Sequence, residues 1–254
     1  MNITILQRPG QFTAKDFTRN LESALNLLKG ELSAFTRLDS FSKKGWARID
    51  VDGPDSEILS ELIARELGRA QTDLATLSPN GVYDGIIAGQ FHDNLEVDIG
   101  TERPKPVNVK IALGTLRAQL ADGKPLPGSE IVQGYCLFPG SRVSVRITRL
   151  RPDGGVEGWF ADSKINQLAS WIATELDRIQ IYDSYRSEIE SAIKKSNLER
   201  DIVSLESMTL TAQSVVCKLG TDAVGLIPKL GSALRKRELN PFIPKRILAR
   251  CRPW

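Results

Sequence analysis

The sequence predicts an α+β protein with a βαββα module, an inserted β-barrel and a C-terminal helical α+β module. Three observations lead to this fold class. Short segments with alternating apolar and polar residues, joined by Gly/Pro turns, cluster between residues 81 and 161. Apolar stripes of helical period lie on both sides of this cluster. The two ends of the chain also share a pattern of elements. We therefore expect domains at residues 1–70, 81–161 and 162–254.

The N-terminal module is expected to run strand, helix, strand, strand, helix. Residues 3–8 form the first strand, and Thr13 starts a helix that ends near Gly30. The next four segments are a strand at 34–41, a turn at 42–45, a strand at 46–51 and a helix introduced by Gly53-Pro54-Asp55. Residues 71–82 are polar and indicate a linker.

The central segment begins with two strands, 83–91 and 95–100, around the turn His92-Asp93-Asn94. Alternation in the second strand turns Leu95, Val97 and Ile99 inward and leaves Glu96 and Asp98 on a solvated outer face. Further predicted elements are strands at 107–111, 142–150 and 155–160, a helix at 113–120 and a Gly/Pro loop at 122–129. A strand ending in Val-Asp-Ile-Gly resembles the early strands of S1-type OB barrels, and this resemblance implies binding of single-stranded RNA.

From Asp162 the chain is predicted to be helical, with an apolar stripe that continues to Ile179 and a second stripe over 185–193. A strand pair at 202–210 and 213–219 and a helix at 222–236 follow. Gly220 and Asp222 match Gly53 and Asp55 when the two ends are aligned. The match is either a coincidence between amphipathic elements or a duplicated module. In both cases the Gly-x-Asp sequence is expected to begin a helix.

Residues 217–227, Cys-Lys-Leu-Gly-Thr-Asp-Ala-Val-Gly-Leu-Ile, resemble a family of conserved archaeal proteins, domain of unknown function 2110. The Val-Asp-Ile-Gly strand and Asn240-Pro241-Phe242-Ile243-Pro244 share in the resemblance, which extends over the whole chain. It implies an archaeal, cytoplasmic setting and no particular activity.

The composition narrows the functional classes. Three separated cysteines fit neither a disulfide framework nor a zinc site. No apolar run approaches the roughly 20 residues of a membrane span, and no secretory signal is seen, so a cytoplasmic protein without a membrane partner is expected. His92 is the single histidine, and the sequence lacks a phosphate-binding glycine loop. We predict no catalytic residue, no metal site and no cofactor.

Charge is distributed unevenly along the chain. The net charge is +3, but residues 229–254 hold eight basic residues against one acid. Such an end indicates binding of a polyanion. Prolines 241 and 244 are expected to keep it extended. The predicted nucleic-acid-binding residues there are Arg235, Lys236, Arg237, Lys245, Arg246 and Arg250, and Arg246 and Arg250 share a face if the stretch is helical.

The barrel adds further predicted contacts. Arg142 and Arg146 share one strand face, whereas Arg149 points the other way unless a bulge intervenes. Phe91 is expected to stack on bases, while Trp159 and Phe160 are interpreted as packing residues. Acids and bases balance over 83–160, nine of each, which weakens the case for a strongly cationic barrel.

The predicted function is RNA binding in the translation or transcription apparatus, with rRNA or a ribosomal surface as the partner. Two alternatives stay open. One is a protein–protein adaptor whose barrel and flanking modules bind protein partners. The other is an enzyme that acts on RNA or a nucleotide without a recognisable motif.

Overall fold

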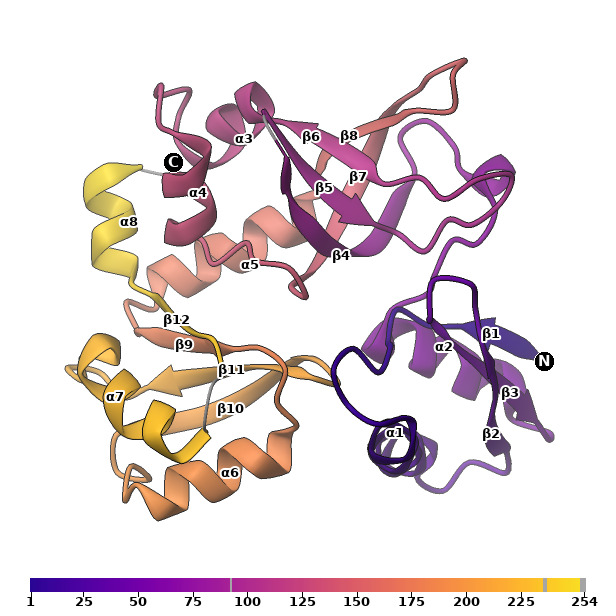
Figure 1. Ribbon diagram of the computed structural model, residues 1–254, viewed down its shortest axis with the longest axis horizontal. Helices are drawn as coiled ribbons and strands as arrows, with labels where there is room; N and C mark the ends of the chain where they lie inside the picture. The colour runs from indigo at the N-terminus through magenta and orange to yellow at the C-terminus, as the bar shows by residue number, and fades with distance from the viewer. Residues whose placement is uncertain (92, 235–236, 252–254) are drawn as a thin grey trace.

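Three separate β-sheets organise the chain in the computed structural model, which describes residues 1–91, 93–234 and 237–251. The central sheet is a closed barrel, and a smaller open sheet lies on either side of it in the sequence. In Figure 1 the two open sheets lie side by side beneath the barrel. The expected α+β class with an inserted barrel is confirmed.

The N-terminal module consists of β1 (Asn2–Thr4), α1 (Ala14–Lys29), β2 (Phe35–Phe41), β3 (Ala47–Asp52) and α2 (Ser56–Leu67). Its antiparallel sheet has the order β1-β3-β2. The Thr13 Oγ1 atom accepts a hydrogen bond from the Asp16 amide at 3.1 Å, so α1 begins where the capping pattern predicts. Both helices cover the sheet, and their fully buried contacts include Phe17, Leu21, Leu59 and Ile63.

The barrel contains β4 (Val82–Phe91), β5 (Asn94–Asp98), β6 (Val109–Ala112), β7 (Arg142–Leu150) and β8 (Val156–Phe160). Its strand order is β4-β5-β6-β8-β7, and β6 pairs with β8 in parallel. The short 3-10 helix η1 (Leu74–Thr76) precedes it, while α3 (Leu113–Leu120) and α4 (Gly128–Gly134) separate its third and fourth strands. This arrangement is an OB-like barrel. Helix α4 shortens the loop expected at 122–129.

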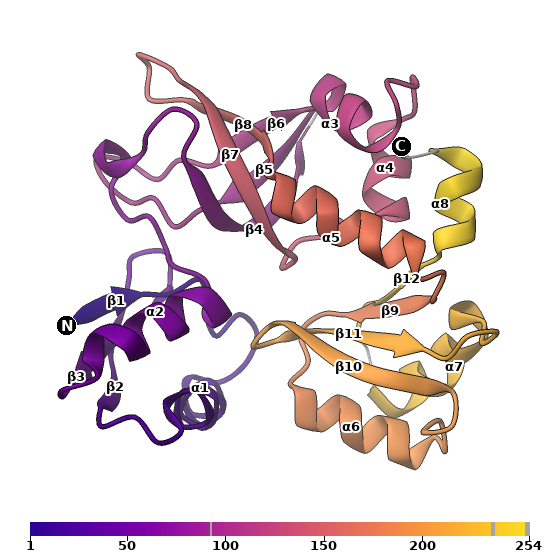
Figure 2. The same ribbon diagram turned by 180° about the vertical axis from the view of Figure 1, so that it is seen from behind.

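The predicted long helix after Asp162 is wrong beyond residue 173. Helix α5 (Asp162–Ala173) ends there, and the chain turns through Glu175, whose φ is 53°. Strand β9 (Arg178–Ile181) follows, so Ile179 belongs to a sheet. Leu168, Trp171 and Ile172 of α5 pack into the hydrophobic core of the barrel. Figure 2 shows α5 between the barrel and the C-terminal sheet.

The C-terminal sheet has the order β10-β11-β9-β12, with antiparallel pairs. Its elements are β9, α6 (Arg186–Lys195), β10 (Ile202–Thr209), β11 (Ala212–Cys217), α7 (Ala223–Leu234) and β12 (Leu239–Phe242). Without β12, both the element order and the strand order repeat those of the N-terminal module. This shared topology favours duplication over coincidence.

The two Gly-x-Asp sequences both precede helices, but the aspartates bond differently. The Asp222 carboxylate accepts hydrogen bonds from the Val224 and Gly225 amides at 3.1 and 3.2 Å and so caps α7. Asp55 occupies the N-cap position of α2, yet its carboxylate accepts from the Ser33 amide at 2.8 Å. It therefore ties the helix start to the preceding loop.

The basic C-terminal segment is extended, as predicted, in β12 but is helical after it. Pro241 lies in the edge strand β12, where a missing amide is tolerated, and Pro244 is the first residue of α8 (Pro244–Arg250). Phe242, Ile247 and Cys251 are buried in the hydrophobic core of the barrel. Apolar burial thus fixes this segment on the barrel despite its charge. Among the residues described, no helix is long and apolar enough to cross a membrane.

Candidate nucleic-acid interface

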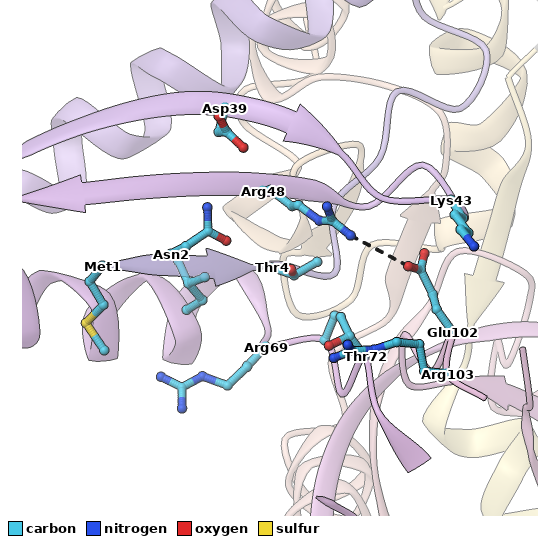
Figure 3. A pocket seen from close by; sticks show the side chains of 12 residues that line it. Met1, Asn2, Thr4, Asp39, Lys43, Arg48, Arg69, Thr72, Glu102 and Arg103 are labelled. Atoms are coloured by element: carbon cyan, nitrogen blue, oxygen red, sulfur yellow. Dashed lines mark ion pairs between the residues drawn. The ribbon is translucent and has the colours of Figure 1, made fainter. Parts of the chain in front are cut away.

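A hollow of about 680 Å³ lies between the N-terminal module and the barrel. We call it the junction groove. Figure 3 shows side chains from four segments around it: β1, the β2–β3 hairpin, the segment that connects α2 to the barrel, and the segment that follows β5. Its charged lining residues are Asp39, Lys43, Arg48, Arg69, Glu102 and Arg103.

The hairpin turn between β2 and β3 holds the two sides together. The Lys44 ammonium lies 2.8 Å from Asp98 Oδ1, and its side chain is 16% exposed against 10% for Asp98. The Lys44 amide donates to Glu102 Oε1 at 2.8 Å. A long-range contact thus fixes the position of the hairpin relative to β5.

The expected solvated outer face of β5 is wrong for Asp98. The side chain does point out of the barrel, as the alternation predicts, but the N-terminal hairpin covers it and supplies a lysine. Its Oδ1 also accepts from the Gly100 amide at 2.8 Å. Glu96, on the same face, is half-buried and accepts from Asn108 Nδ2 at 3.0 Å.

Glu102 is a buried acid that lines the junction groove. Burial raises its pKa, but hydrogen bonds from Ser42 and from the Lys44 and Lys43 amides, together with the charge of Arg48, outweigh burial. The pKa of Glu102 therefore lies below its ordinary value. The Arg48 guanidinium is 3.8 Å from the carboxylate. Glu102 is thus an ionised structural anchor, and its charge is already neutralised within the protein.

The remaining charges leave the junction groove cationic. Four basic residues line it against two acids, and one of these acids is the internally paired Glu102. The side chains of Arg48, Arg69 and Arg103 are 39%, 43% and 72% exposed. Arg69 pairs with Glu61 and Arg103 with Asp73, but both pairs lie at the surface, where an ion pair contributes only about 0–1 kcal/mol. These guanidiniums can therefore exchange their partners for phosphate oxygens.

Two of the predicted barrel arginines make structural contacts. Arg142 donates to the Glu66 and Arg65 carbonyls at 2.6 and 2.7 Å and pairs with Asp84 at 2.7 Å. It therefore binds the C-terminal end of α2 to the barrel. Arg146 donates to the Asn80 carbonyl at 3.1 Å and lies 3.4 Å from Asp162.

Arg149 and Phe91 are exposed, as a binding role requires. The pairing of β7 with β8 shifts register between Ile147 and Arg149, so a bulge does intervene. After it, Leu150 packs against the barrel core and Arg149 is exposed. Phe91 is 53% exposed at the end of β4. The structure places Phe160 in the core as expected, but Trp159 is 43% exposed and is not a core residue.

The predicted cations of the C-terminal segment are only partly brought together. Lys245, Arg246 and Arg250 are exposed on α8, and the helix places Arg246 and Arg250 on one face. Arg250 pairs with Glu130 of α4 at 3.2 Å. Arg237 lies elsewhere, 3.7 Å from Glu188 and over the Phe12 ring. Arg235 and Lys236 lie outside the described residues.

Sequence analysis missed the cations of the junction groove. Lys43, Arg48, Arg69 and Arg103 come from separate segments, none of which is rich in basic residues. The available signal was the Ser42-Lys43-Lys44-Gly45 turn, which places two lysines at a hairpin tip. In the part of the chain that the structure describes, no group of three His, Cys, Asp or Glu side chains is placed to hold a metal ion.

One part of the chain is similar to a known domain family. No curated protein matches the chain. Residues 176–240 match the model of the DUF2110 C-terminal domain. The matched residues begin just before β9 and end within β12, so they cover nearly all of the C-terminal sheet together with α6 and α7. The C-terminal module is therefore similar to a domain family of unknown function.

Proposed function

We propose that this protein binds RNA and that the junction groove is its main phosphate-binding surface. The observation that supports this proposal is the convergence of Lys43, Arg48, Arg69 and Arg103 around one hollow. Arginine is suited to phosphate recognition because its planar fork donates two parallel hydrogen bonds. The proposed setting is the translation or transcription apparatus, with rRNA or a ribosomal surface as the partner.

The position of the junction groove beside the barrel suits single-stranded RNA. A second hollow, also of about 680 Å³, opens on the β5–β6 face. Its charged lining residues are Arg8, Lys44, Lys105, Lys110, Glu96, Asp98 and Asp153. Lys44 contributes to this hollow, while its neighbour Lys43 contributes to the junction groove. An RNA strand bound in the junction groove can therefore continue into the second hollow, across the surface of the barrel. Four basic residues against three acids give the second hollow a smaller excess of positive charge than the junction groove, so it is the weaker anion site.

Salt dependence tests the proposal. For single-stranded RNA each phosphate contact contributes about −0.7 to the slope of log K against log[salt]. The triple variant Lys43→Ala/Arg69→Ala/Arg103→Ala should flatten that slope by about two units, measured by fluorescence anisotropy from 50 to 200 mM salt. It leaves Arg48 in place to neutralise Glu102.

The matched control is Lys245→Ala/Arg246→Ala/Arg250→Ala, which removes three exposed cations from α8. We expect it to change the slope less. If it flattens the slope instead, and the groove variant does not, then the phosphate contacts lie on α8. Absence of binding at 50 mM salt would contradict RNA binding altogether. Co-sedimentation with ribosomal particles, lost in the groove variant, tests the proposed partner.

A protein–protein adaptor is the second candidate, and one feature of the barrel favours it. Val82 and Trp159 lie on either side of Arg146 across three neighbouring strands, and they are 48% and 43% exposed. Tryptophan and arginine are enriched at the centres of protein interfaces. A partner bound there would be lost on Trp159→Ala and retained after nuclease treatment, whereas an RNA-mediated association would be lost with the nuclease.

A further inference from the structure

Another hollow, of about 320 Å³, lies where α2, β7, α5 and β10 meet. We call it the Lys164 pocket. Its lining includes Arg65, Arg142, Ser163, Lys164 and Gln167. Three parts of the fold therefore supply side chains to one small space.

Lys164 is buried without an acidic partner. Its side chain is attached to the first turn of α5, and the residue is 8% exposed. The ammonium donates to Gln167 Oε1 at 2.8 Å and lies 5.4 Å from the centre of the Trp171 ring. Among the ion pairs of the described residues, none includes Lys164, although the other basic groups of the pocket have acids: Arg142 pairs with Asp84 and Arg65 with Glu66.

A second buried cation shares the same tryptophan. Arg178 is 5% exposed, and its guanidinium carbon lies 4.6 Å from the centre of the Trp171 ring. It pairs with Glu206 Oε2 at 2.7 Å, and Glu206 lines the pocket. The Nε atom of Arg178 is buried without a hydrogen-bond partner in the structure. Glu206 is thus already engaged by Arg178, which leaves the charge of Lys164 unbalanced.

An unbalanced buried ammonium is costly, since desolvation favours its neutral form. Burial lowers the pKa of Lys164 to about 8, because it outweighs the smaller, opposite effect of nearby Cys136. The amine is therefore still mostly charged at pH 7. An anion that enters the pocket would replace the lost hydration and restore the balance of charge.

We propose that the Lys164 pocket binds a phosphate group, whose negative charge balances Lys164. Two other lining groups suit an oxyanion: Gln167 keeps its amide NH₂ free to donate while its oxygen accepts from Lys164, and Ser163 supplies a hydroxyl. The two lining carboxylates, Asp84 and Glu206, are already paired with Arg142 and Arg178. The volume lies at the lower end of small-molecule sites, so the ligand is a phosphate or a small phosphate ester. This site is independent of the proposed RNA binding.

Protection of Lys164 from acetylation tests the site in the wild-type protein. Inorganic phosphate at ten times its Kd should slow acetylation of Lys164 about tenfold, because only unoccupied molecules react. Mass spectrometry of the Lys164 peptide gives the rate, and sodium chloride at equal ionic strength is the reference. Exposed Lys195 serves as the internal control and should react at the same rate in both salts. An unchanged rate at Lys164 would overturn the proposal.

Variants provide the second measurement. Phosphate should raise the Tm of the wild-type protein and of Lys195→Met above the value in matched chloride, and it should not raise that of Lys164→Met. Retention of the full rise by Lys164→Met would place the phosphate elsewhere and overturn the proposal. Adenosine monophosphate is the second probe. If it also raises the Tm of the wild-type protein but not that of Lys164→Met, the pocket accepts a phosphate ester; if only inorganic phosphate does so, the ligand is the free ion. Acetate that stabilises the protein as well as phosphate does would show a general anion site without selectivity for phosphate and would contradict the assignment.

Discussion

The Lys44 ammonium and the Asp98 carboxylate form a nearly buried ion pair that joins the N-terminal module to the barrel. Removing one member of such a pair leaves the other charge desolvated, at a cost of about 3–5 kcal/mol when the pair is fully buried. Because a tenth or more of each side chain is exposed, we expect Lys44→Met to lower the free energy of unfolding by about 2 kcal/mol. Urea denaturation measures the change.

A double-mutant cycle separates the pair from other effects of the substitution. Lys44→Met/Asp98→Asn should be more stable than the sum of the two single changes predicts, since it leaves no unpaired charge. The exposed pair of Arg19 and Asp16 is the control, and Arg19→Met should change stability by less than about 1 kcal/mol. Additive single effects at Lys44 and Asp98 would show that the pair does not couple the two modules.

Single residues of β5 also show which contacts the sequence can predict and which it cannot. The pattern of Leu95, Val97 and Ile99 correctly predicts which side of β5 is buried. The same pattern assigns Asp98 to solvent, because it describes one strand and contains no information about a hairpin 54 residues earlier. The junction groove depends on that long-range contact, so its residues could not be found from local spacing.

Gly53 and Gly220 occupy equivalent positions before the second helix of each module, with φ values of 114° and 85°. A Cβ at Gly53 would lie 2.7 Å from the Ser33 carbonyl oxygen, whereas a Cβ at Gly220 meets nothing within 4 Å. Gly220→Ala should therefore cost about 1 kcal/mol for the backbone conformation alone. Gly53→Ala should cost about 3 kcal/mol, because backbone overlap is added.

Thermal or urea unfolding of the two alanine variants measures this difference. Equal costs would mean that the loop containing Ser33 moves aside freely. The Asp55 carboxylate bonds the Ser33 amide, which holds that loop in place and opposes such a movement.

Helices and strands with a regular spacing of apolar residues or a clear N-cap signal could be predicted. Of these, α1, α3 and β7 lie close to their expected ranges. The wrong predictions occur where the same sequence pattern is compatible with two kinds of secondary structure. Ile172, Leu176 and Ile179 continue the helical period of α5, although the chain turns at Glu175 and enters β9. Helix α4 has a proline at its N-cap position and begins and ends with glycine, so its sequence is typical of a loop.

Phe242 connects the C-terminal sheet to the core of the barrel. It is the last residue of β12, is fully buried, and packs edge-on against Trp171 with ring centres 5.4 Å apart. Phe242→Ala should lower the free energy of unfolding by about 3–5 kcal/mol, the usual range for a buried Phe. Tryptophan fluorescence during urea unfolding measures the change, because unfolding exposes Trp171 to solvent.

Phe35 provides the matched control for this substitution. It is 73% exposed on β2, so Phe35→Ala should change stability by less than about 1 kcal/mol. A small effect of Phe242→Ala would show that the barrel is stable without the C-terminal segment. A second unfolding transition in that variant would show that the segment joins two otherwise independent units.

The return of β12 and α8 to the barrel determines the order in which the molecule can fold during its synthesis. The buried cluster of the N-terminal module is complete once Leu67 has left the ribosome. The barrel strands end at Phe160, but their core also contains Phe242, Ile247 and Cys251. A nascent chain must therefore hold an incomplete barrel, with apolar surface exposed to other chains, until almost the whole sequence has been translated.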